Sequence, residues 1–337
     1  MQVLDVSNDS FNLFTECDLY IAAASFEYER SIAASTMLSK RLRAKCAIIL
    51  AFTGKTSAAA QENKYQSRTR LFEQMSLIDI SKAPRVVLAG RYEYSSTLRQ
   101  IEGELEARGV SKCSAVILDI SCLTAVQLVY VIRWLHSVVR PKSCVVIYSR
   151  PSRYDNENLT PVDYEIMPLP IRVSPQSTIS EARRIAVMVM GHEGIRSLAT
   201  WRAIDPVNTL LLFPASGSAK FDKTCSKQNS YLIGLSRKSP GVSVKTATTL
   251  DLARARKMVS SSLDDWSSAS HVRVSLIPFG PKPLIVAATL SILDAANVDF
   301  ELVYAIPKRY SGRYSAGVEA VYFEQIAISD DFRKDQP

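Results

Sequence analysis

Residues 147–154 read Ile-Tyr-Ser-Arg-Pro-Ser-Arg-Tyr, and residues 303–310 read Val-Tyr-Ala-Ile-Pro-Lys-Arg-Tyr. Both stretches contain a β-branched residue, a Tyr, a Pro three positions after that Tyr, and a closing Arg-Tyr pair. Each stretch begins with the last two residues of an apolar run that is expected to form a strand. These runs are residues 144–148 and 300–304. The recurrence of this pattern near the middle and near the end of the chain indicates one structural unit used twice.

A second short match supports this duplication. The pattern Glu-x-x-Arg-Ser occupies residues 27–31 and residues 193–197, and it follows the first expected strand of each half. The fourth expected strand of each half also leads into the most apolar helix of that half, at residues 123–139 and 284–296. A helix that is apolar over most of its surface is normally covered on several sides.

The order of elements predicts the fold class. Strands alternate with helices of ten or more residues, which is typical of parallel β-α units. We therefore predict an α/β fold with two tandem Rossmann-like parallel-sheet lobes related by internal duplication. One extra strand is expected after each set of five, at residues 164–167 and 318–328. The expected core strands are 19–25, 46–52, 85–89, 114–119 and 144–148 in the first half, and 184–190, 209–213, 242–247, 272–277 and 300–304 in the second.

The predicted domain boundaries follow the chain. The closely spaced prolines between residues 161 and 175 indicate a connection between lobes, and the charged end indicates a frayed terminus. The expected segments are an N-terminal extension (1–17), lobe 1 (18–170), a linker (171–183), lobe 2 (184–329) and a flexible tail (330–337).

Composition narrows the class of protein. The net charge of +8 favours an anionic partner, which could be a nucleotide, a nucleic acid or an acidic protein face, although it is also compatible with simple solubility. The six cysteines form no C-x-x-C pair, and several lie in apolar runs, so we expect buried free thiols in a reducing compartment. No apolar run approaches the ~20 residues of a membrane span, and residues 1–17 lack a signal-peptide core. We expect a cytoplasmic protein.

Ligands of open parallel sheets bind outside the carboxyl ends of the strands, where the strand order reverses. We expect the first and fourth strands to be neighbours there. The relevant loops are then residues 26–31 with 119–123 in lobe 1, and residues 191–197 with 278–283 in lobe 2. The candidate ligand-binding residues are Glu193, Arg196, Ser216, Gly217, Gly280, Lys282, Arg309 and Tyr310.

The turn at residues 278–283, Pro-Phe-Gly-Pro-Lys-Pro, is the most distinctive of these loops. Gly280 would let the backbone approach a ligand closely. Lys282 would place a cation beside the electropositive start of the following helix, which suits a phosphate. The alternative is a rigid strand-to-helix turn with a solvated lysine.

This Gly-x-Lys-Pro turn resembles the Gly-Thr-Lys-Pro-Met signature of CRISPR-associated Rossmann-fold (CARF) sensor domains. The resemblance covers Gly280, Lys282 and Pro283, whereas Pro281 and Leu284 depart from the signature. It implies a pocket for cyclic oligoadenylate at a two-fold interface. The whole chain also resembles Rossmann-like proteins of bacterial antiviral defence loci.

The other candidates have two interpretations each. Glu193 and Arg196 are one helical turn apart, so they could pair with each other or grip a ligand. The small-residue loop at 216–218 precedes two lysines and could hold a phosphate through backbone N–H groups. Arg309 with Tyr310 could stack a base and hold its phosphate, whereas Arg153 with Tyr154 is more consistent with a structural turn.

Several chemical signatures are absent from the sequence. Residues 53–56, Thr-Gly-Lys-Thr, match the end of a P-loop motif. That motif also requires a Gly five residues before Gly54, and Ile49 occupies this position. The chain has no G-x-G-x-x-G after a strand, no H-E-x-x-H, no G-x-S-x-G and no metal-spaced Cys/His set. We therefore assign no catalytic residue, no metal and no cofactor.

The leading hypothesis is a nucleotide- or nucleic-acid-binding sensor or regulatory subunit of an antiviral defence system, with a protein partner in a complex. Lobe 2 is expected to hold the better anion site, because Asp119 occupies the equivalent turn of lobe 1. One alternative is an enzyme acting on a nucleotide or its glycosidic bond, with Glu27 or Glu193 as acid/base. The other alternative is a protein-interaction scaffold, and the question of catalysis stays open.

Overall fold

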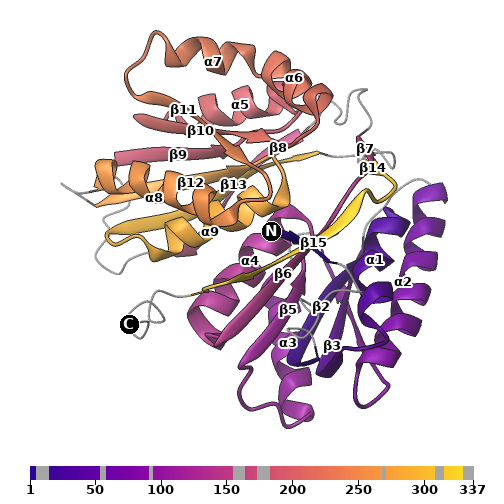
Figure 1. Cartoon of the computed structure of the whole chain (residues 1–337). Helices are drawn as coiled ribbons and strands as arrows, with labels where there is room; N and C mark the ends of the chain where they lie inside the picture. Colours follow the sequence, from indigo (N-terminus) through magenta and orange to yellow (C-terminus); the bar gives the residue numbers. More distant parts are fainter. Residues whose placement is uncertain are drawn as a thin grey trace. The chain divides into compact units, whose positions relative to one another are not determined.

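The computed structural model describes residues 1–4, 15–53, 58–90, 94–154, 164–172, 183–267, 271–307 and 315–328. The chain divides into two compact units, which are described separately. Unit 1 comprises Met1–Glu157 with Ser311–Pro337, and unit 2 comprises Asn158–Tyr310. Each unit is a mostly parallel sheet with helices on both faces (Figure 1), which confirms the predicted α/β class.

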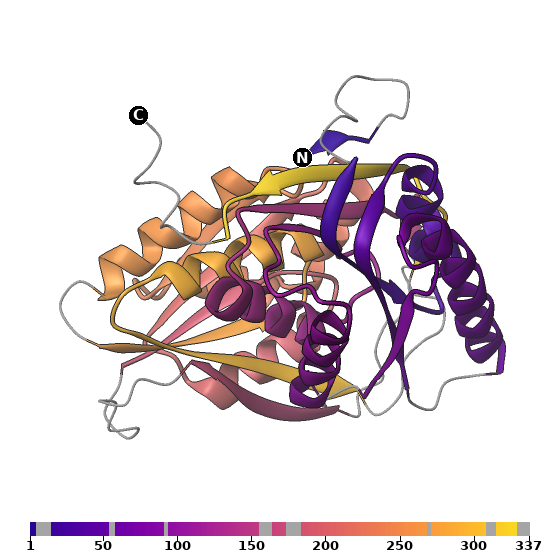
Figure 2. The same ribbon diagram turned by 90° about the horizontal axis from the view of Figure 1, so that it is seen from below.

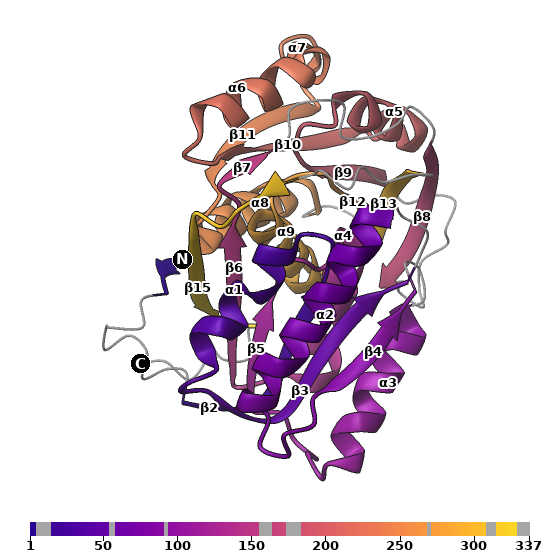
Figure 3. The same ribbon diagram turned by 90° about the vertical axis from the view of Figure 1, so that its right-hand side faces the viewer.

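Unit 1 contains a seven-stranded sheet in the order β1-β15-β6-β5-β2-β3-β4. Strands β2 to β6 are parallel, whereas β1 and β15 are antiparallel to their neighbours. Helices α1 and α2 pack together on one face of the sheet, and α3 and α4 pack on the other (Figure 3). The bounds are β1 Gln2–Val3, β2 Glu16–Ala24, α1 Tyr28–Leu38, β3 Arg43–Phe52, α2 Ala58–Ile78, β4 Arg85–Ala89, α3 Tyr94–Ala107, β5 Ala115–Asp119, α4 Ala125–Trp134, β6 Ser143–Arg150 and β15 Ala320–Ile326. A π-helical turn, Leu135–Val139, extends α4.

Unit 2 contains a six-stranded sheet in the order β11-β10-β9-β12-β13-β8. Only β8 is antiparallel to its neighbour. The bounds are β8 Tyr164–Arg172, β9 Arg183–Val189, α5 Gly194–Ile204, β10 Asn208–Ala215, α6 Ala219–Gln228, α7 Ser230–Ser236, β11 Val242–Thr248, α8 Leu252–Ser267, β12 Val272–Pro278, α9 Lys282–Asp294 and β13 Val298–Pro307.

The five core strands have the same order in both units. Numbered within each unit, they run third, second, first, fourth, fifth: β4-β3-β2-β5-β6 in unit 1 and β11-β10-β9-β12-β13 in unit 2. The fourth strand lies beside the first in each case, as the sequence analysis expected. The duplication inferred from short motifs therefore extends to the topology of both sheets.

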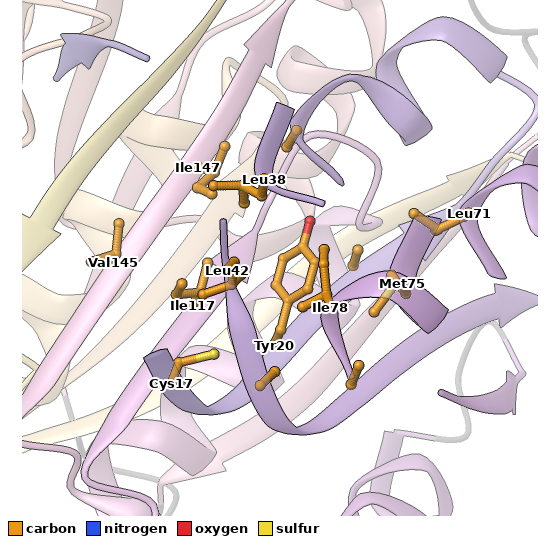
Figure 4. Packing of buried hydrophobic residues seen from close by; sticks show 14 of the residues in the cluster. Cys17, Tyr20, Leu38, Leu42, Leu71, Met75, Ile78, Ile117, Val145 and Ile147 are labelled. Carbon is orange, nitrogen blue, oxygen red and sulfur yellow. The ribbon is translucent and has the colours of Figure 1, made fainter. Parts of the chain in front are cut away.

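Burial explains why these residues form inner strands. Residues 17–24 of β2 are all buried, as expected for a strand covered on both faces. On the side covered by α1 and α2, the ring of Tyr20 lies among Leu42, Ile78 and Ile117 (Figure 4). Helix α9 is equally enclosed, with residues 283–293 all buried. The six cysteines are buried free thiols, as predicted.

The edge strands correct the predicted domain boundaries. Strand β8, from the first half of the sequence, pairs antiparallel with β13 and belongs to unit 2. Strand β15, from the second half, pairs antiparallel with β6 and belongs to unit 1 (Figures 1 and 2). The lobes predicted at residues 18–170 and 184–329 are therefore wrong at their ends, because each half of the sequence supplies the sixth strand of the other sheet.

Each exchanged strand is held by buried side chains of its new sheet. Leu169 and Ile171 of β8 are buried in unit 2, and Val321 and Phe323 of β15 are buried in unit 1. Arg172 at the end of β8 also donates to the carbonyl of Leu293, at 2.7 Å, and to other carbonyls at the end of α9. A period of two identifies a strand but does not say which sheet it joins, so the sequence did not reveal the exchange.

The remaining boundary predictions concern the ends and the connection. Residues 1–4 and 15–17 belong to unit 1, and β2 already begins at Glu16, inside the predicted N-terminal extension. The predicted linker begins within β8, and its residues 173–182 lie outside the described residues. The predicted tail at 330–337 also lies outside them. No described helix combines the length and the apolar character needed to cross a membrane.

Substitutions in the two exchanged strands test this topology. Phe323→Ala should destabilise unit 1 by about 3–5 kcal/mol, and Ile171→Ala should destabilise unit 2 by about 2–5 kcal/mol, because both remove buried apolar volume. Hydrogen–deuterium exchange should show faster exchange in β6 for Phe323→Ala and in β13 for Ile171→Ala. Faster exchange in β13 for Phe323→Ala and in β6 for Ile171→Ala would contradict the exchange of strands between the two halves.

Candidate functional site

A buried ion pair lies at the carboxyl edge of the unit 1 sheet. The Arg30 guanidinium donates to Glu27 Oε1 at 2.8 Å, and both side chains are less than a tenth exposed. Its remaining donors reach the carbonyl oxygens of Ser149 and Ser121, each at 2.9 Å, and Ser315 Oγ at 3.2 Å. Burial alone would lower the pKa of Arg30, but the Glu27 carboxylate keeps it above its ordinary value.

Unit 2 contains the corresponding pair. Arg196 donates to the carboxylate of Glu193 and to the carbonyl oxygen of Ala305, and its side chain is 2% exposed. Its guanidinium also lies 4.9 Å from the centre of the Phe279 ring and 5.5 Å from that of Tyr304. Burial raises the pKa of Glu193, and the charge of Arg196 opposes that shift.

The two repeated sequence patterns therefore meet in space. Arg30 contacts the carbonyl of the residue after Tyr148, and Arg196 contacts the carbonyl of the residue after Tyr304. Each arginine also lies over that tyrosine ring, at 5.7 Å and 5.5 Å respectively. Of the two interpretations of Glu193 and Arg196, the geometry supports the structural pair, because each guanidinium ties the first helix of its unit to the end of the fifth strand.

This pair occupies the place where Rossmann proteins bind a pyrophosphate. Glu27 and Glu193 are the N-cap residues of α1 and α5, the helices that follow the first strands. A carboxylate at a helix N-terminus is favourable for the helix but repels a phosphate. In both units this position therefore holds a glutamate that is paired with an arginine one helical turn further on.

The turn around Gly280 is packed against the chain itself. A Cβ atom built at Gly280 would lie 2.4 Å from the carbonyl oxygen of Met190. One built at Gly191 would lie 2.0 Å from the carbonyl oxygen of Phe279. The loops after the first and fourth strands of unit 2 thus meet backbone to backbone. The expected close approach at Gly280 occurs, but the group that approaches is the unit's own main chain.

The loop at residues 216–218 is also satisfied internally. The N–H of Ser216 donates to Asp222 Oδ1 at 3.0 Å, and the N–H of Ser218 donates to Ser216 Oγ at 3.1 Å. Gly217 has a φ of +79°, a conformation that glycine adopts readily. Because a carboxylate already accepts from Ser216, the predicted phosphate cradle at Ser216 and Gly217 is disfavoured.

The candidate Lys282 and the neighbouring residue His192 have defined positions in unit 2. Lys282 is the first residue of α9 and is partly exposed at the carboxyl edge of unit 2. The His192 ring packs on Phe221, with centroids 4.0 Å apart, and its Nε2 lies 3.2 Å from the carbonyl oxygen of Phe221. Burial lowers the pKa of His192, which favours the neutral ring. Arg309 and Tyr310 lie outside the described residues.

Asp119 is enclosed rather than open to a ligand. It is 2% exposed and accepts the N–H of Ser121 at 2.9 Å, while Ser121 Oγ accepts the N–H of Ser149 at 2.7 Å. This network closes the unit 1 turn that corresponds to the Lys282 turn.

One residue of the unit 1 site was not expected from the sequence. Ser315 donates a hydrogen bond from its hydroxyl group to the carboxylate of Glu27, which lies 288 positions earlier in the chain. The spacing of residues contains no signal for such a contact.

Within the described part of the chain, no group of three or more His, Cys, Asp or Glu side chains could hold a metal ion.

No family model matches the sequence, and no curated protein matches it. Among solved structures, the complex of leucoanthocyanidin reductase with NADPH from Vitis vinifera aligns over 84% of this chain and 92% of its own chain. The identity is 10% and the TM-score 0.23, values too low to support an argument about function.

Removing the unit 1 guanidinium should expose its structural role. Arg30→Met leaves Glu27 buried without its cation, which should cost about 3–5 kcal/mol of stability. The double variant Glu27→Gln/Arg30→Met should be less destabilised, because no uncompensated charge remains. Urea unfolding of the three proteins measures both effects, and a wild-type midpoint for Arg30→Met would refute the structural role.

Glycine substitutions test the packing of the Gly280 turn. Gly280→Ala should destabilise the protein by about 1–3 kcal/mol, because the added methyl group overlaps the Met190 carbonyl. The control is Gly103→Ala in α3, where nothing lies within 4 Å of the new Cβ atom and stability should rise by about 0.5–1 kcal/mol. Equal melting temperatures for the two variants would show that the turn is not tightly packed.

Proposed function

We propose that this chain is a non-catalytic regulatory protein that binds a nucleotide at the carboxyl edge of unit 2. The observation that carries the proposal is the difference between the two repeated edges. In unit 1, Asp119 and Ser121 close the turn. In unit 2, the same place has Lys282 at the start of a helix, next to a turn whose Phe279 ring packs beside Arg196.

The chemistry of this edge suits a phosphate and a base. The start of α9 supplies a positive partial charge, and Lys282 adds a full one. Tyr304 is only partly buried and offers an aromatic surface near by, because its ring lies 5.9 Å from that of Phe279. Most of the positive balance of the chain also lies in unit 2, where Lys and Arg outnumber Asp and Glu by three to two.

The resemblance of the Gly-x-Lys-Pro turn to CARF domains extends this proposal to cyclic oligoadenylates as ligands and to antiviral defence as the setting. The enzyme alternative has one observation in its favour, since burial raises the pKa of Glu193 as a general acid requires. The bond from Arg196 to that carboxylate favours the regulatory proposal, because it holds the group in a structural role.

Lys282→Ala tests the proposal. The variant should lose about 1.5–3 kcal/mol of binding, a roughly ten- to hundredfold weaker affinity, because one charge-assisted contact to phosphate is removed. Isothermal titration with adenosine mono-, di- and triphosphates and with cyclic oligoadenylates provides the measurement. Lys257→Ala, an exposed lysine of α8, is the matched control. Binding by Lys282→Ala equal to that of the control would refute a phosphate role for this turn.

A further inference from the structure

Helix α6 displays a row of lysines on its outer side. Lys220, Lys223 and Lys227 are all exposed, and they lie within about 60° of one another around the helix axis. The buried residues Phe221 and Cys225 lie on the opposite side and fix α6 to its unit. Figure 3 shows α6 and α7 following one another over β10 and β11. The lysine row therefore faces away from the core of unit 2.

The three lysines bring three positive charges to one face of the helix. No described carboxylate lies within ion-pair distance of the three ammonium groups. The acidic residue of α6, Asp222, lies about 100° or more from each lysine and accepts the N–H of Ser216 instead. Three like charges on one helix face repel one another, so an anionic partner would relieve that repulsion.

An exposed aromatic ring extends the row. Tyr231, in the first turn of α7, follows Lys227 by four residues and is 53% exposed. Hydrogen bonds of the helical type continue across the junction, from Asn229 N to the Cys225 carbonyl and from Ile233 N to the Asn229 carbonyl. The Arg202 guanidinium of α5 lies 5.6 Å from the centre of the Tyr231 ring. The three lysines and the arginine-backed tyrosine thus lie on two consecutive helices that meet at Asn229.

From this arrangement we propose that the α6–α7 face binds single-stranded nucleic acid. The lysines contact successive phosphates, and Tyr231 stacks on an unpaired base with Arg202 beside it. A membrane surface is a poorer partner, because the apolar side of α6 is already buried in unit 2 and none remains for a bilayer. The proposal goes beyond the nucleotide site at Lys282, since it concerns a different surface with different residues.

The test measures binding of fluorescent 12-nucleotide oligo-dT and oligo-U by anisotropy at 50–200 mM salt. Lys220→Ala/Lys223→Ala/Lys227→Ala should bind more weakly, and the slope of log K against log salt should become about 2 units shallower, because each contact contributes about 0.7. The control Lys40→Ala/Lys112→Ala/Lys257→Ala removes the same charge from exposed positions elsewhere. Melting curves for both triple variants confirm that they are folded.

Tyrosine variants separate stacking from charge. Tyr231→Ala should weaken binding roughly five- to hundredfold without changing the salt slope, and Tyr231→Phe should retain wild-type affinity. Lys282→Ala should bind the oligonucleotides normally, so failure of the nucleotide proposal leaves this one intact. The inference is overturned if the wild-type protein binds neither oligonucleotide, if it prefers duplex DNA or anionic vesicles, or if the two lysine triple variants bind alike.

Discussion

A charge buried in each sheet's carboxyl edge must be compensated, and that constraint organises both units. An unpaired guanidinium in the interior would cost several kcal/mol, so a buried arginine needs a counter-charge and acceptors near by. The acceptors of Arg30 are Glu27 at the start of the first helix, Ser121 in the turn after the fourth strand, and Ser149 of the fifth strand. Arg196 repeats the contacts to the first helix and to the fifth strand. The pair thus connects segments that the chain order keeps far apart.

The same constraint reduces the choice of function. Glu27 and Glu193 stand at the N-cap positions of the helices that follow the first strands, and each pairs with an arginine. The place where a Rossmann unit usually binds its ligand thus holds a structural ion pair in both units. The two units differ in the turn after the fourth strand, which lies next to the Glu–Arg ion pair. Unit 1 has a closed Asp119–Ser121 turn, whereas unit 2 has Lys282 at the start of a helix. A duplicated chain can keep one copy for stability and let the other copy bind a ligand, and the proposed nucleotide site at Lys282 is an example of such a division.

The sequence predicted local structure well because local structure has local causes. Apolar runs as short as residues 19–25 favour inner strands, and the order of the runs leaves few possible topologies. The Glu-x-x-Arg-Ser and Tyr-x-x-Pro patterns were recognised separately, but nothing in their spacing said that they touch. Gly280 was expected to face a ligand, and only the fold shows that the Met190 carbonyl fills that space.

The pairing of the edge strands was also not predictable from the sequence, and this affected the predicted domain boundaries. Residues 164–172 and 320–326 have strand character, and a strand prefers the nearest sheet in the chain unless another edge fits better. Prolines 168 and 170 suit an edge position, but they suit the edge of either sheet. The exchange depends on which buried side chains find complementary neighbours, a property of the folded units rather than of any segment.

Each half of the chain completes the sheet of the other half. A protease site inserted between Gln176 and Ser177, which lie between β8 and β9 in the sequence, allows the folded chain to be cut into two halves. The halves should co-elute as a one-to-one complex in size-exclusion chromatography, because β8 stays paired with β13 and β15 with β6. Separation into two independently folded halves under native conditions would contradict the exchange of strands.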